Sequence, residues 1–477
     1  MSRSVRVRFA PAPTGMMHLG NIRQALINLI FARQHQGVCI LRIEDTDQQR
    51  MFDPSGSQIR ADLAWLGITF DEGPDIGGSY GPYIQSQRTE IYQQHLHQLI
   101  DRNLVYRCFC TTEELEKQRQ RQIMLHQPPR YPRTCRNLPQ AHIEQNIAEK
   151  KPFIWRFKLN AEQVTIHELV RGPITFDLNN FADFPLTRQD GSFTFLFANA
   201  IDDITMKISH VFRGEDHLSN TANQAMIYQA FNAPLPIFWH TPIICNRDGK
   251  KLSKRDFGFS LDDLRTGGFL PEAIINYLAC IGSSIEGSEI LPLDALIARI
   301  NFAEHSTSSS IKYDVDKLRW MNHAWMKRLP VQEIAHRCRT FLEAEYPAAR
   351  AMSDHELAML IEIIHTELTT LADSIQALHC YFHVPEINPH DPIFIELASL
   401  KPVIEDIFMN LSPKLSIDDN LKMVQERITA HRADRKQTYK FIRLALSGAS
   451  EGTSISNLFK LLPMTEIITR LKRIYHS

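Results

Sequence analysis

The chain has 477 residues, of which 43% are hydrophobic, and its 53 lysines and arginines nearly balance 54 aspartates and glutamates. This length predicts two to four domains, and no apolar run reaches the roughly 18 residues that a membrane-spanning helix requires. The near-neutral charge excludes a broadly basic surface, so any polyanionic partner must be bound by local patches. The N-terminal segment lacks the apolar stretch of a secretory signal, and we therefore expect a cytoplasmic protein.

The first fifty residues predict a βαβ unit. Residues 5–10 alternate as a strand does, and Pro11 and Pro13 then interrupt the pattern. Apolar residues recur at helical spacing over 21–35, and 38–43 is a nearly continuous apolar run, typical of a buried parallel strand. A strand, a glycine loop, a helix and a second strand form the opening of a doubly wound, Rossmann-type fold.

Later segments predict an insertion in this sheet and a helical tail. We expect helices over 56–67, 88–104, 113–126 and 221–231, and strands over 154–159, 174–176, 193–197, 208–212 and 237–245. Residues 301–311, rich in serine, predict a loop. Nearly everything else beyond residue 270 has the pattern of amphipathic helices. The predicted fold is an α/β Rossmann-type catalytic domain with an α+β insertion, followed by an all-α C-terminal domain.

Two distant segments have the composition of one nucleotide site. In the first, Gly15 and Gly20 permit close backbone approach, and His18 precedes a helix whose free N–H groups suit phosphate. In the second, Lys251 and Lys254 follow a glycine turn, and their ammonium groups can follow negative charge that develops on an α-phosphate. Taken singly, the segments are equally consistent with a turn around a packed histidine and with a solvated basic turn.

The motifs as a set resemble the bacterial glutamyl-tRNA synthetase family of class I aminoacyl-tRNA synthetases. They are Phe9-Ala-Pro-Ala-Pro-Thr-Gly-Met-Met-His-Leu-Gly-Asn21, Leu41-Arg-Ile-Glu-Asp-Thr-Asp47, Asp71-Glu-Gly-Pro-Asp75, Gly81-Pro-Tyr-Ile-Gln-Ser-Gln-Arg88, Phe212-Arg-Gly-Glu-Asp-His217, Lys251-Leu-Ser-Lys-Arg255 and Leu318-Arg-Trp-Met-Asn322. They keep the family's order between residue 5 and about residue 325. The tail resembles the family in length and character more than in motif.

The resemblance implies a reaction and the residues that perform it. Glutamate attacks ATP, with accompanying Mg²⁺, to give glutamyl-adenylate, which is then transferred to the 3′-terminal adenosine of tRNA(Glu). The implied ATP-binding residues are Pro13, Thr14, Gly15, His18, Gly20, Asn21, Lys251, Ser253 and Lys254, of which His18, Lys251 and Lys254 are catalytic. The implied glutamate-binding residues are Arg8, Ala10, Ala12, Glu44, Phe195, Asn199 and Arg213, with arginine suited to carboxylates and Glu44 to the ammonium group.

Two of these positions depart from the family pattern. The family usually has serine in place of Ala12 and tyrosine in place of Phe195. Each departure removes a hydroxyl beside the amino acid, and a lost buried hydrogen bond costs about 1 kcal/mol. We expect glutamate to remain the preferred amino acid, because the charged residues are retained.

The inserted segment contains a candidate zinc site. Cys108, Cys110 and Cys135 offer three thiolates, and zinc prefers tetrahedral sulfur and nitrogen ligands. Some members of the family bind zinc with this pattern, but this chain has Asn137 where a histidine ligand would be expected. Tyr131 is the fourth ligand that truncated relatives suggest. The alternative is a small core of three reduced cysteines.

The tail contains a basic stripe. Arg432, Lys436, Lys440 and Arg443 recur at helical spacing, and we predict that they contact tRNA phosphates. A solvated helix face is the alternative.

The resemblance also implies a division into domains and a set of partners. We expect a catalytic domain in two halves (1–84 and 190–246), an acceptor-end insertion (85–189), a stem-contact region (247–328) and an anticodon-binding domain (329–477). The expected protein is a monomer that binds tRNA(Glu), and the sequence leaves open whether it also charges tRNA(Gln). Glutamylation of a modified tRNA base and a noncatalytic tRNA-binding paralogue are rival interpretations; the long tail disfavours the first, and the intact ATP and glutamate residues disfavour the second.

Overall fold

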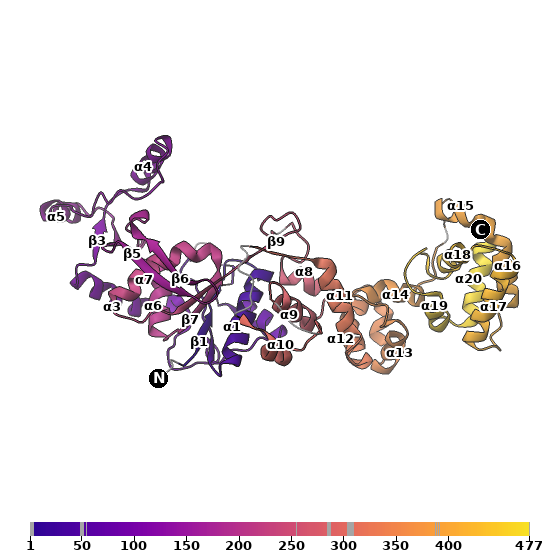
Figure 1. Cartoon of the computed structure of the whole chain (residues 1–477). Coiled ribbons are helices and arrows are strands. Elements are labelled where there is room, and N and C mark those ends of the chain that lie inside the picture. The colour runs from indigo at the N-terminus through magenta and orange to yellow at the C-terminus, as the bar shows by residue number, and fades with distance from the viewer. Residues whose placement is uncertain are drawn as a thin grey trace. The chain divides into compact units, whose positions relative to one another are not determined.

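The computed structural model describes residues 4–47, 52–53, 55–253, 255–283, 288–302, 310–386, 388, 390 and 392–476. The chain divides into two compact units (Figure 1). The first comprises residues 1–262 and 275–314, and the second comprises residues 263–274 and 315–477. We describe each unit separately.

The first unit opens with the predicted βαβ arrangement. Strand β1 (Arg6–Phe9) pairs in parallel with β2 (Val38–Leu41), and helix α1 (Leu19–Gln34) connects them. Helix α1 is buried along most of its length, because it packs on the sheet with Leu26 and Ile30 fully inaccessible. The helix begins directly after the proline–glycine loop, so its N-terminus lies at the carboxyl end of β1.

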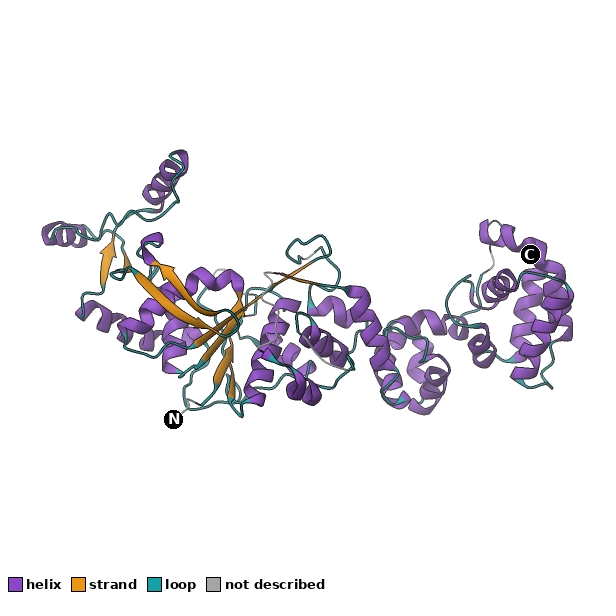
Figure 2. Ribbon diagram, in the orientation of Figure 1, coloured by secondary structure: helices purple, strands orange, loops and turns teal. Residues whose placement is uncertain are grey.

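A mixed four-stranded sheet completes the core of the first unit (Figure 2). Its strand order is β6 (Gly172–Asp177), β5 (Gln163–Glu168), β8 (Ile237–Thr241) and β7 (His210–Gly214). Strands β5, β8 and β7 run in parallel, whereas β6 is antiparallel to β5. Next to β7 lies β1, since the amide of Ser209 donates to the carbonyl of Arg6 at 2.9 Å. Helix α7 (Leu218–Ala230) packs against α6 (Phe195–Thr205) and β5.

The expected strand over 193–197 is wrong. Phe195 is instead the first residue of α6. Phe197, Ala198 and Ile201 are fully buried on this helix, and short apolar runs do not distinguish a buried helix from a buried strand. The helical conformation matters for function, because it places Asn199 on the same element as the acidic pair Asp202 and Asp203.

Two other expectations need correction. The strand expected over 237–245 is divided into β8 and β9 (Ile243–Cys245) at Pro242, which has no N–H to donate to a ladder. In the expected loop 301–311, residues 303–309 lie outside the described residues, and Ser310 begins a short strand, β10 (Ser310–Lys312), parallel to β9. Three residues of each strand pair there, which is too short a pattern to stand out in the sequence.

The remaining helices and strands of the first unit surround this core. Before the insertion are α2 (Ser57–Trp65), the 3₁₀ turn η2 (Gln85–Arg88) and α3 (Thr89–Asp101). The insertion contains the antiparallel pair β3 (Val105–Cys108) and β4 (Ile154–Phe157), and the exposed helices α4 (Thr112–Met124) and α5 (Gln140–Ala148). Strand β5 and helix α5 were not predicted. Later short elements are η3 (Leu178–Asn180), η4 (Glu215–His217) and α10 (Leu293–Arg299). Helices α8 (Leu261–Thr266) and α9 (Pro271–Cys280) each contain residues of both units.

The second unit is helical throughout its described residues. Its helices are α11 (Val315–Met326), α12 (Val331–Glu345), α13 (Asp354–Ile364), α14 (Asp373–Phe382), α15 (Pro392–Leu397), α16 (Lys401–Asn410), α17 (Ile417–Ala430), α18 (Arg435–Ser447), α19 (Ile455–Leu461) and α20 (Met464–His476), with 3₁₀ turns η6 (Pro347–Ala351) and η7 (Ala398–Leu400). Each longer helix buries one apolar stripe, as amphipathic helices in a bundle do. Among the described residues, no helix has the length and apolar character needed to cross a membrane.

A buried asparagine joins three segments of the second unit. Asn322, on α11, is inaccessible to solvent. Its Oδ1 accepts from the amide of Leu270 at 2.8 Å, and its Nδ2 donates to the carbonyl of Thr369 at 2.6 Å. The side chain therefore satisfies backbone groups of two loops that no regular ladder pairs.

We predict that Asn322→Ala lowers the free energy of unfolding by about 2–4 kcal/mol, because it leaves two buried backbone groups unpaired. Urea denaturation measures the loss, and faster hydrogen exchange at the Leu270 amide locates it. Arg319→Ala, on the exposed face of the same helix, is the control and should change stability by less than about 0.5 kcal/mol. Equal effects of the two substitutions would contradict the role of Asn322.

Candidate functional site

The two segments that the sequence proposed as halves of one site lie side by side. His18 and Ser260 form an antiparallel bridge. The amide of Leu19 donates to the carbonyl of Phe259 at 3.1 Å, and the amide of Leu261 donates to the carbonyl of Met17 at 3.0 Å. The imidazole of His18 also lies against the Phe259 ring, with 5.2 Å between centroids. The glycine–histidine loop is thus joined to the chain just beyond the lysine loop.

The lysine loop begins as a small hairpin after β9. Cys245 and Lys251 form an antiparallel bridge, and Gly249 turns the chain with a φ of +78°. The Ser253 amide and hydroxyl both donate to Asp256 Oδ2 at 2.9 Å, which holds the loop after the hairpin. Lys251 is exposed, and Lys254 lies outside the described residues. Lys251 is therefore an exposed cation on a loop that hydrogen bonds to Asp256 hold in place.

His18 is built to donate a hydrogen bond while uncharged. It caps α1: its Nδ1 accepts from the Asn21 amide at 3.3 Å, and Asn21 Oδ1 accepts from the His18 amide at 3.4 Å. Because Nδ1 accepts, the proton of the neutral ring is on Nε2. Burial lowers the pKa of His18 below 6.5, nearby Lys251 lowers it further, and Asp216 opposes them. Gly20 accommodates the ring, since a β-carbon there would lie 3.0 Å from His18 Cε1.

An acidic residue that sequence reasoning gave no role lies between the two loops. Asp216, in the turn after β7, is 3.5 Å from the Lys251 ammonium and raises the pKa of His18. It belongs to the quoted segment Phe212 to His217, so its place in a motif was the available signal. Gly214 leaves room for it, because a β-carbon there would lie 2.6 Å from Asp216 Oδ1.

The rest of the proline–glycine loop has a graded exposure. Pro13 is buried, and its carbonyl accepts from the Phe52 amide at 2.8 Å. Ala12, Thr14 and Gly15 are exposed, and Ala10 is half-buried. The carbonyl of Pro11 also accepts from the Glu44 amide at 3.0 Å, so the loop is anchored on both sides of the exposed Ala12.

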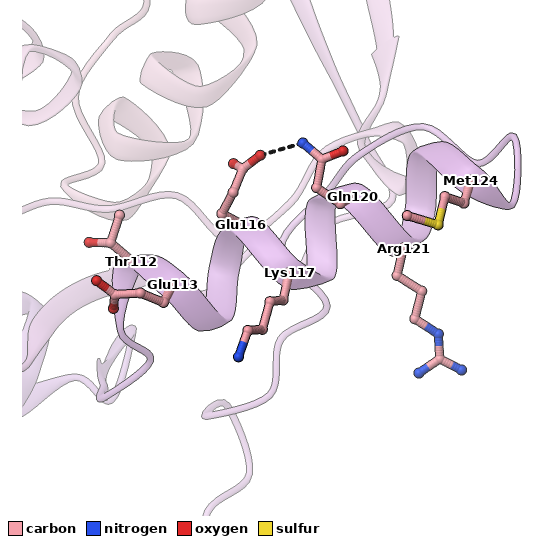
Figure 3. Close-up of a pocket in the computed structure, with 7 residues that line it drawn as sticks. All are labelled: Thr112, Glu113, Glu116, Lys117, Gln120, Arg121 and Met124. Carbon is pink, nitrogen blue, oxygen red and sulfur yellow. Dashed lines mark hydrogen bonds between the residues drawn. The ribbon is translucent and has the colours of Figure 1, made fainter.

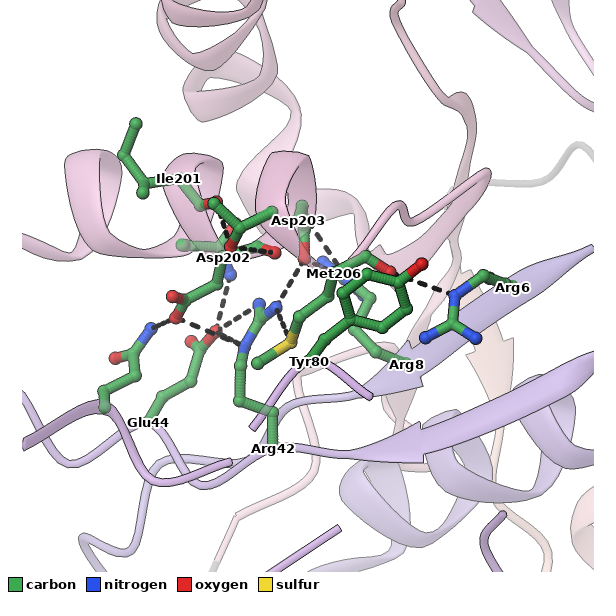
Figure 4. Close-up of polar contacts among 12 residues, drawn as sticks. Arg6, Arg8, Arg42, Glu44, Tyr80, Ile201, Asp202, Asp203 and Met206 are labelled. Atoms are coloured by element: carbon green, nitrogen blue, oxygen red, sulfur yellow. Dashed lines mark hydrogen bonds and ion pairs between the residues drawn. The ribbon is translucent and has the colours of Figure 1, made fainter. Parts of the chain in front are cut away.

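Beneath the loops lies a network of buried charges centred on Arg42 (Figure 4). The Arg42 guanidinium contacts Glu44 Oε1 at 2.8 Å and Asp203 Oδ1 at 2.7 Å, and it lies 3.6 Å from Asp202. Asp202 also accepts from Arg88 at 2.6 Å. The network joins the segment after β2 to helix α6, and its two aspartates, Asp202 and Asp203, were not predicted from the sequence. Their signal was the acidic pair one turn after Asn199 on the same helix.

Arg8 and Glu44, two predicted glutamate-binding residues, belong to this network. Arg8 Nε lies 3.1 Å from Asp203 Oδ1, and its NH1 donates to the Phe212 carbonyl at 3.2 Å. Burial raises the pKa of Glu44, although Arg42 opposes the shift. All hydrogen bonds that Glu44 accepts from described side chains end on Oε1, from Arg42 and Asn199. Oε2 is left to accept from a ligand.

Asn199 and Arg213 complete the network through Gln224, which the sequence analysis missed. Asn199 Nδ2 donates to Glu44 Oε1 at 2.7 Å, and Asn199 Oδ1 accepts from Gln224 Nε2 at 2.8 Å. Gln224 Oε1 in turn accepts from Arg213 NH1 at 2.7 Å. Arg213 NH2 donates to Thr221 Oγ1 at 2.6 Å.

Arg213 is a buried cation without a matching anion. Its side chain is 7% exposed, it forms no ion pair with a described residue, and its Nε has no hydrogen-bond partner. Burial lowers the pKa of Arg213 to about 10, and Arg8 contributes in the same direction. The predicted neighbour Phe195 is half-buried, with its ring 5.4 Å from that of His217. The buried charge of Arg213 is therefore not compensated by a carboxylate of any described residue.

The predicted zinc ligands lie together in the insertion. One ligand atom from each of Cys108, Cys110 and Cys135 lies within 4.8 Å of the others. The Tyr131 hydroxyl is 3.2 Å from Cys108 Sγ and 3.9 Å from Cys110 Sγ. It also accepts from the Cys135 amide at 3.0 Å. Three thiols and a phenol thus converge, as a four-ligand site requires.

A hollow on the surface of the insertion contains none of the predicted site residues (Figure 3). Its lining side chains all come from α4 and are Thr112, Glu113, Glu116, Lys117, Gln120, Arg121 and Met124. The helix buries no residue, and Gln120 donates to Glu116 at 2.6 Å within it. A depression along one exposed helix has no convergent polar groups and is not the candidate site.

The predicted basic stripe in the tail is wrong as a single helix face. Arg432 precedes α18 and has a φ of +50°, because the chain turns there between two helices. Arg443 is on α18, but it donates to the carbonyls of Ser450 and Thr453 at 2.8 and 3.0 Å. It therefore ties down the following loop. Lys436 is exposed and Lys440 is half-buried on α18.

The chain is similar to known families, proteins and solved structures over nearly its whole length. Residues 4–320 match the family described as tRNA synthetases class I (E and Q), catalytic domain, and residues 319–475 match an anticodon binding domain. The chain is 36% identical to the glutamate–tRNA ligase of Bacillus subtilis, with 99% of this chain and 100% of that protein covered. It is similarly 36% identical to glutamate–tRNA ligase 2 of Syntrophus aciditrophicus, covering 98% of that protein. The crystal structure of glutamate-tRNA synthetase from Elizabethkingia anophelis aligns over 100% of both chains, with 30% identity and a TM-score of 0.85.

We predict that His18 titrates below 6.5 in the folded protein. Between the two pKa values the unfolded chain binds a proton that the folded chain does not, so His18 reduces folding stability as the pH falls through 6.5. An NMR titration of the His18 ring, assigned with His18→Asn, measures the midpoint. Lys251→Met should move it upward and Asp216→Asn downward. A wild-type midpoint above 6.5 would contradict the described environment.

Proposed function

The chain belongs to the class I tRNA synthetases of glutamate and glutamine, and we propose how its residues perform their reaction. The enzyme uses ATP to attach L-glutamate to tRNA. In the proposed first step, the glutamate α-carboxylate attacks the α-phosphate of ATP, the bond to the β-phosphate breaks, and pyrophosphate leaves. In the second step, a hydroxyl of the terminal adenosine attacks the adenylate carbonyl, and AMP leaves.

The proposed nucleotide site is the junction of the two loops. His18 donates from Nε2 to a phosphate oxygen, and the free N–H groups at the start of α1 add their dipole. The backbone of Pro13, Thr14 and Gly15, with Gly20 and Asn21, encloses the nucleotide. Lys251, Ser253 and Lys254 approach from the other side, and the ammonium groups stabilise charge that develops on the α-phosphate. Mg²⁺ accompanies the triphosphate.

The proposed glutamate site is the part of the charge network that contains Glu44, Asn199 and Arg213. The side-chain carboxylate of the substrate pairs with Arg213, and its ammonium group lies at Glu44 Oε2. Asn199 holds the Glu44 side chain in position through its hydrogen bond to Oε1. Arg8 lies near the α-carboxylate, while Ala10, Ala12 and Phe195 line the remaining walls. The single observation that supports glutamate over glutamine is the buried, unpaired charge of Arg213. A neutral amide would leave that charge uncompensated, whereas a carboxylate matches it with bidentate hydrogen bonds.

The insertion and the regions beyond residue 246 are proposed to select the tRNA. We assign 85–189 to the acceptor end, 247–328 to the stem and 329–477 to the anticodon, with 1–84 and 190–246 as the catalytic halves. Arg432, Lys436 and Lys440 are proposed phosphate contacts, whereas the bonds of Arg443 to backbone carbonyls favour a structural role. We further propose a cytoplasmic monomer.

We propose a structural zinc in the insertion. Cys108, Cys110, Cys135 and Tyr131 would hold it, since their donor atoms already converge. Bound there, Zn²⁺ would cross-link a segment that has few buried residues besides Tyr106, Cys108 and Cys135. The site is part of the insertion and contributes no group to the charge network.

Aminoacylation of separate tRNA(Glu) and tRNA(Gln) transcripts with labelled amino acids tests the proposed function. We expect glutamate to be attached to tRNA(Glu) and glutamine to neither transcript. Tests of ATP–pyrophosphate exchange should include tRNA, because we expect glutamate activation to require bound tRNA. Preferred attachment of a neutral amino acid would contradict the proposal, and equal charging of both transcripts would show a non-discriminating enzyme.

Metal analysis tests the zinc site. We expect about one equivalent of zinc in protein purified without chelator, and a loss of most of it in Cys110→Ser. Cys280→Ser replaces a thiol of similar burial outside the cluster and should keep the metal. Wild-type protein with far less than one equivalent would contradict zinc binding.

A further inference from the structure

Gln224 connects the unpaired arginine to the acidic end of the network. The residue lies on α7 and is 2% exposed. Because Arg213 can only donate and Glu44, as a carboxylate, can only accept, the direction of each hydrogen bond between them is determined. Arg213 donates to Gln224, Gln224 donates to Asn199, and Asn199 donates to Glu44, at 2.7, 2.8 and 2.7 Å. The amide orientation of Gln224 is therefore set by its neighbours.

We propose that Gln224 is a specificity-determining positioning residue that aims Arg213 with a neutral oxygen and so leaves its positive charge for an anionic substrate. This inference depends on the proposed contact between Arg213 and the glutamate side chain. Gln224 touches Arg213 and not the reacting atoms. Its contribution is to the choice between a carboxylate and an amide in the substrate.

The chemistry of position 224 favours this role over simple packing. A glutamate would occupy nearly the same volume as the glutamine and would bind Arg213 with a stronger, charge-assisted hydrogen bond. It would also neutralise the only buried arginine of the network that lacks a carboxylate partner among described residues, since Arg8, Arg42 and Arg88 are each paired. Glutamine at position 224 thus leaves the positive charge of Arg213 uncompensated, whereas a glutamate there would neutralise it.

The charges that face Arg213 come from several elements. Arg8 on β1 and burial both disfavour its charge, whereas Asp203 on α6 and Glu44 after β2 favour it. Those two carboxylates are already bound by Arg42. A substrate carboxylate is therefore the counter-ion that the described side chains do not supply.

Steady-state aminoacylation of tRNA(Glu) by Gln224→Glu tests the inference. We expect the KM for glutamate to rise about 30-fold, the order of one hydrogen bond to a charged group, with little change in the KM for ATP. The inhibition constant of glutamine should stay the same or fall. A residue that only packs would weaken both amino acids together, so the ratio of the two constants is the decisive readout.

Control variants separate this inference from the proposed function. Gln229→Glu adds the same charge at an exposed position of the same helix and should leave both constants unchanged. Gln224→Met keeps the volume but loses the oxygen, and should weaken glutamate without improving the relative binding of glutamine. The melting temperature of each variant checks that it folds.

Arg213→Ala completes the set. A large rise in the KM for glutamate in Arg213→Ala, with an unchanged glutamate-to-glutamine ratio in Gln224→Glu, would overturn the role of Gln224 alone. An unchanged KM in Arg213→Ala would overturn the proposed carboxylate contact itself. A higher ratio of the KM for glutamate to the inhibition constant of glutamine in Gln224→Glu, with no such rise in Gln229→Glu, would support the inference.

Discussion

The guanidinium of Arg42 is the interaction on which the site depends. It is fully buried, and it holds Glu44 and Asp203, which come from segments far apart in the chain. Asp203 in turn orients Arg8. Without Arg42, two buried carboxylates would lose their main partner, a change that costs several kcal/mol in comparable pairs. The network therefore fixes the positions of these buried charges, and it is the scaffold of the proposed amino-acid site.

A chain of hydrogen bonds through Asn199 and Gln224 separates the negative charge of Glu44 from the positive charge of Arg213. At one end Glu44 has an oxygen without a described hydrogen-bond donor, and at the other Arg213 pairs with no carboxylate of the described residues. A molecule with an ammonium group at one end and a carboxylate at the other completes both. The two proposed nucleotide loops differ from the network, since burial lowers the pKa of His18 and Lys251 is an exposed cation. In the proposed mechanism, the buried charges select the amino acid, and the exposed Lys251 stabilises charge on the phosphate.

Much of this was predictable because local signals and motifs coincide. The βαβ opening followed from periodicity, whereas the roles of the loop and amino-acid residues come from motifs and stay predictions. The strand expected over 193–197 failed because an apolar run has no period to distinguish a buried helix from a strand. Gln224 and Asp203 were missed because their roles arise from contacts across long sequence separations. Arg432 and Arg443 were misplaced because helical spacing does not reveal where a helix begins or which side chains bind its own loops.

The most direct test of the central claim is a crystal structure of the enzyme with bound L-glutamate. The account predicts the side-chain carboxylate within hydrogen-bond distance of the Arg213 guanidinium and the ammonium group at Glu44 Oε2, with the Gln224–Asn199 bond intact. A glutamate bound with its side-chain carboxylate elsewhere, and Arg213 still contacting only Gln224 and Thr221, would contradict it.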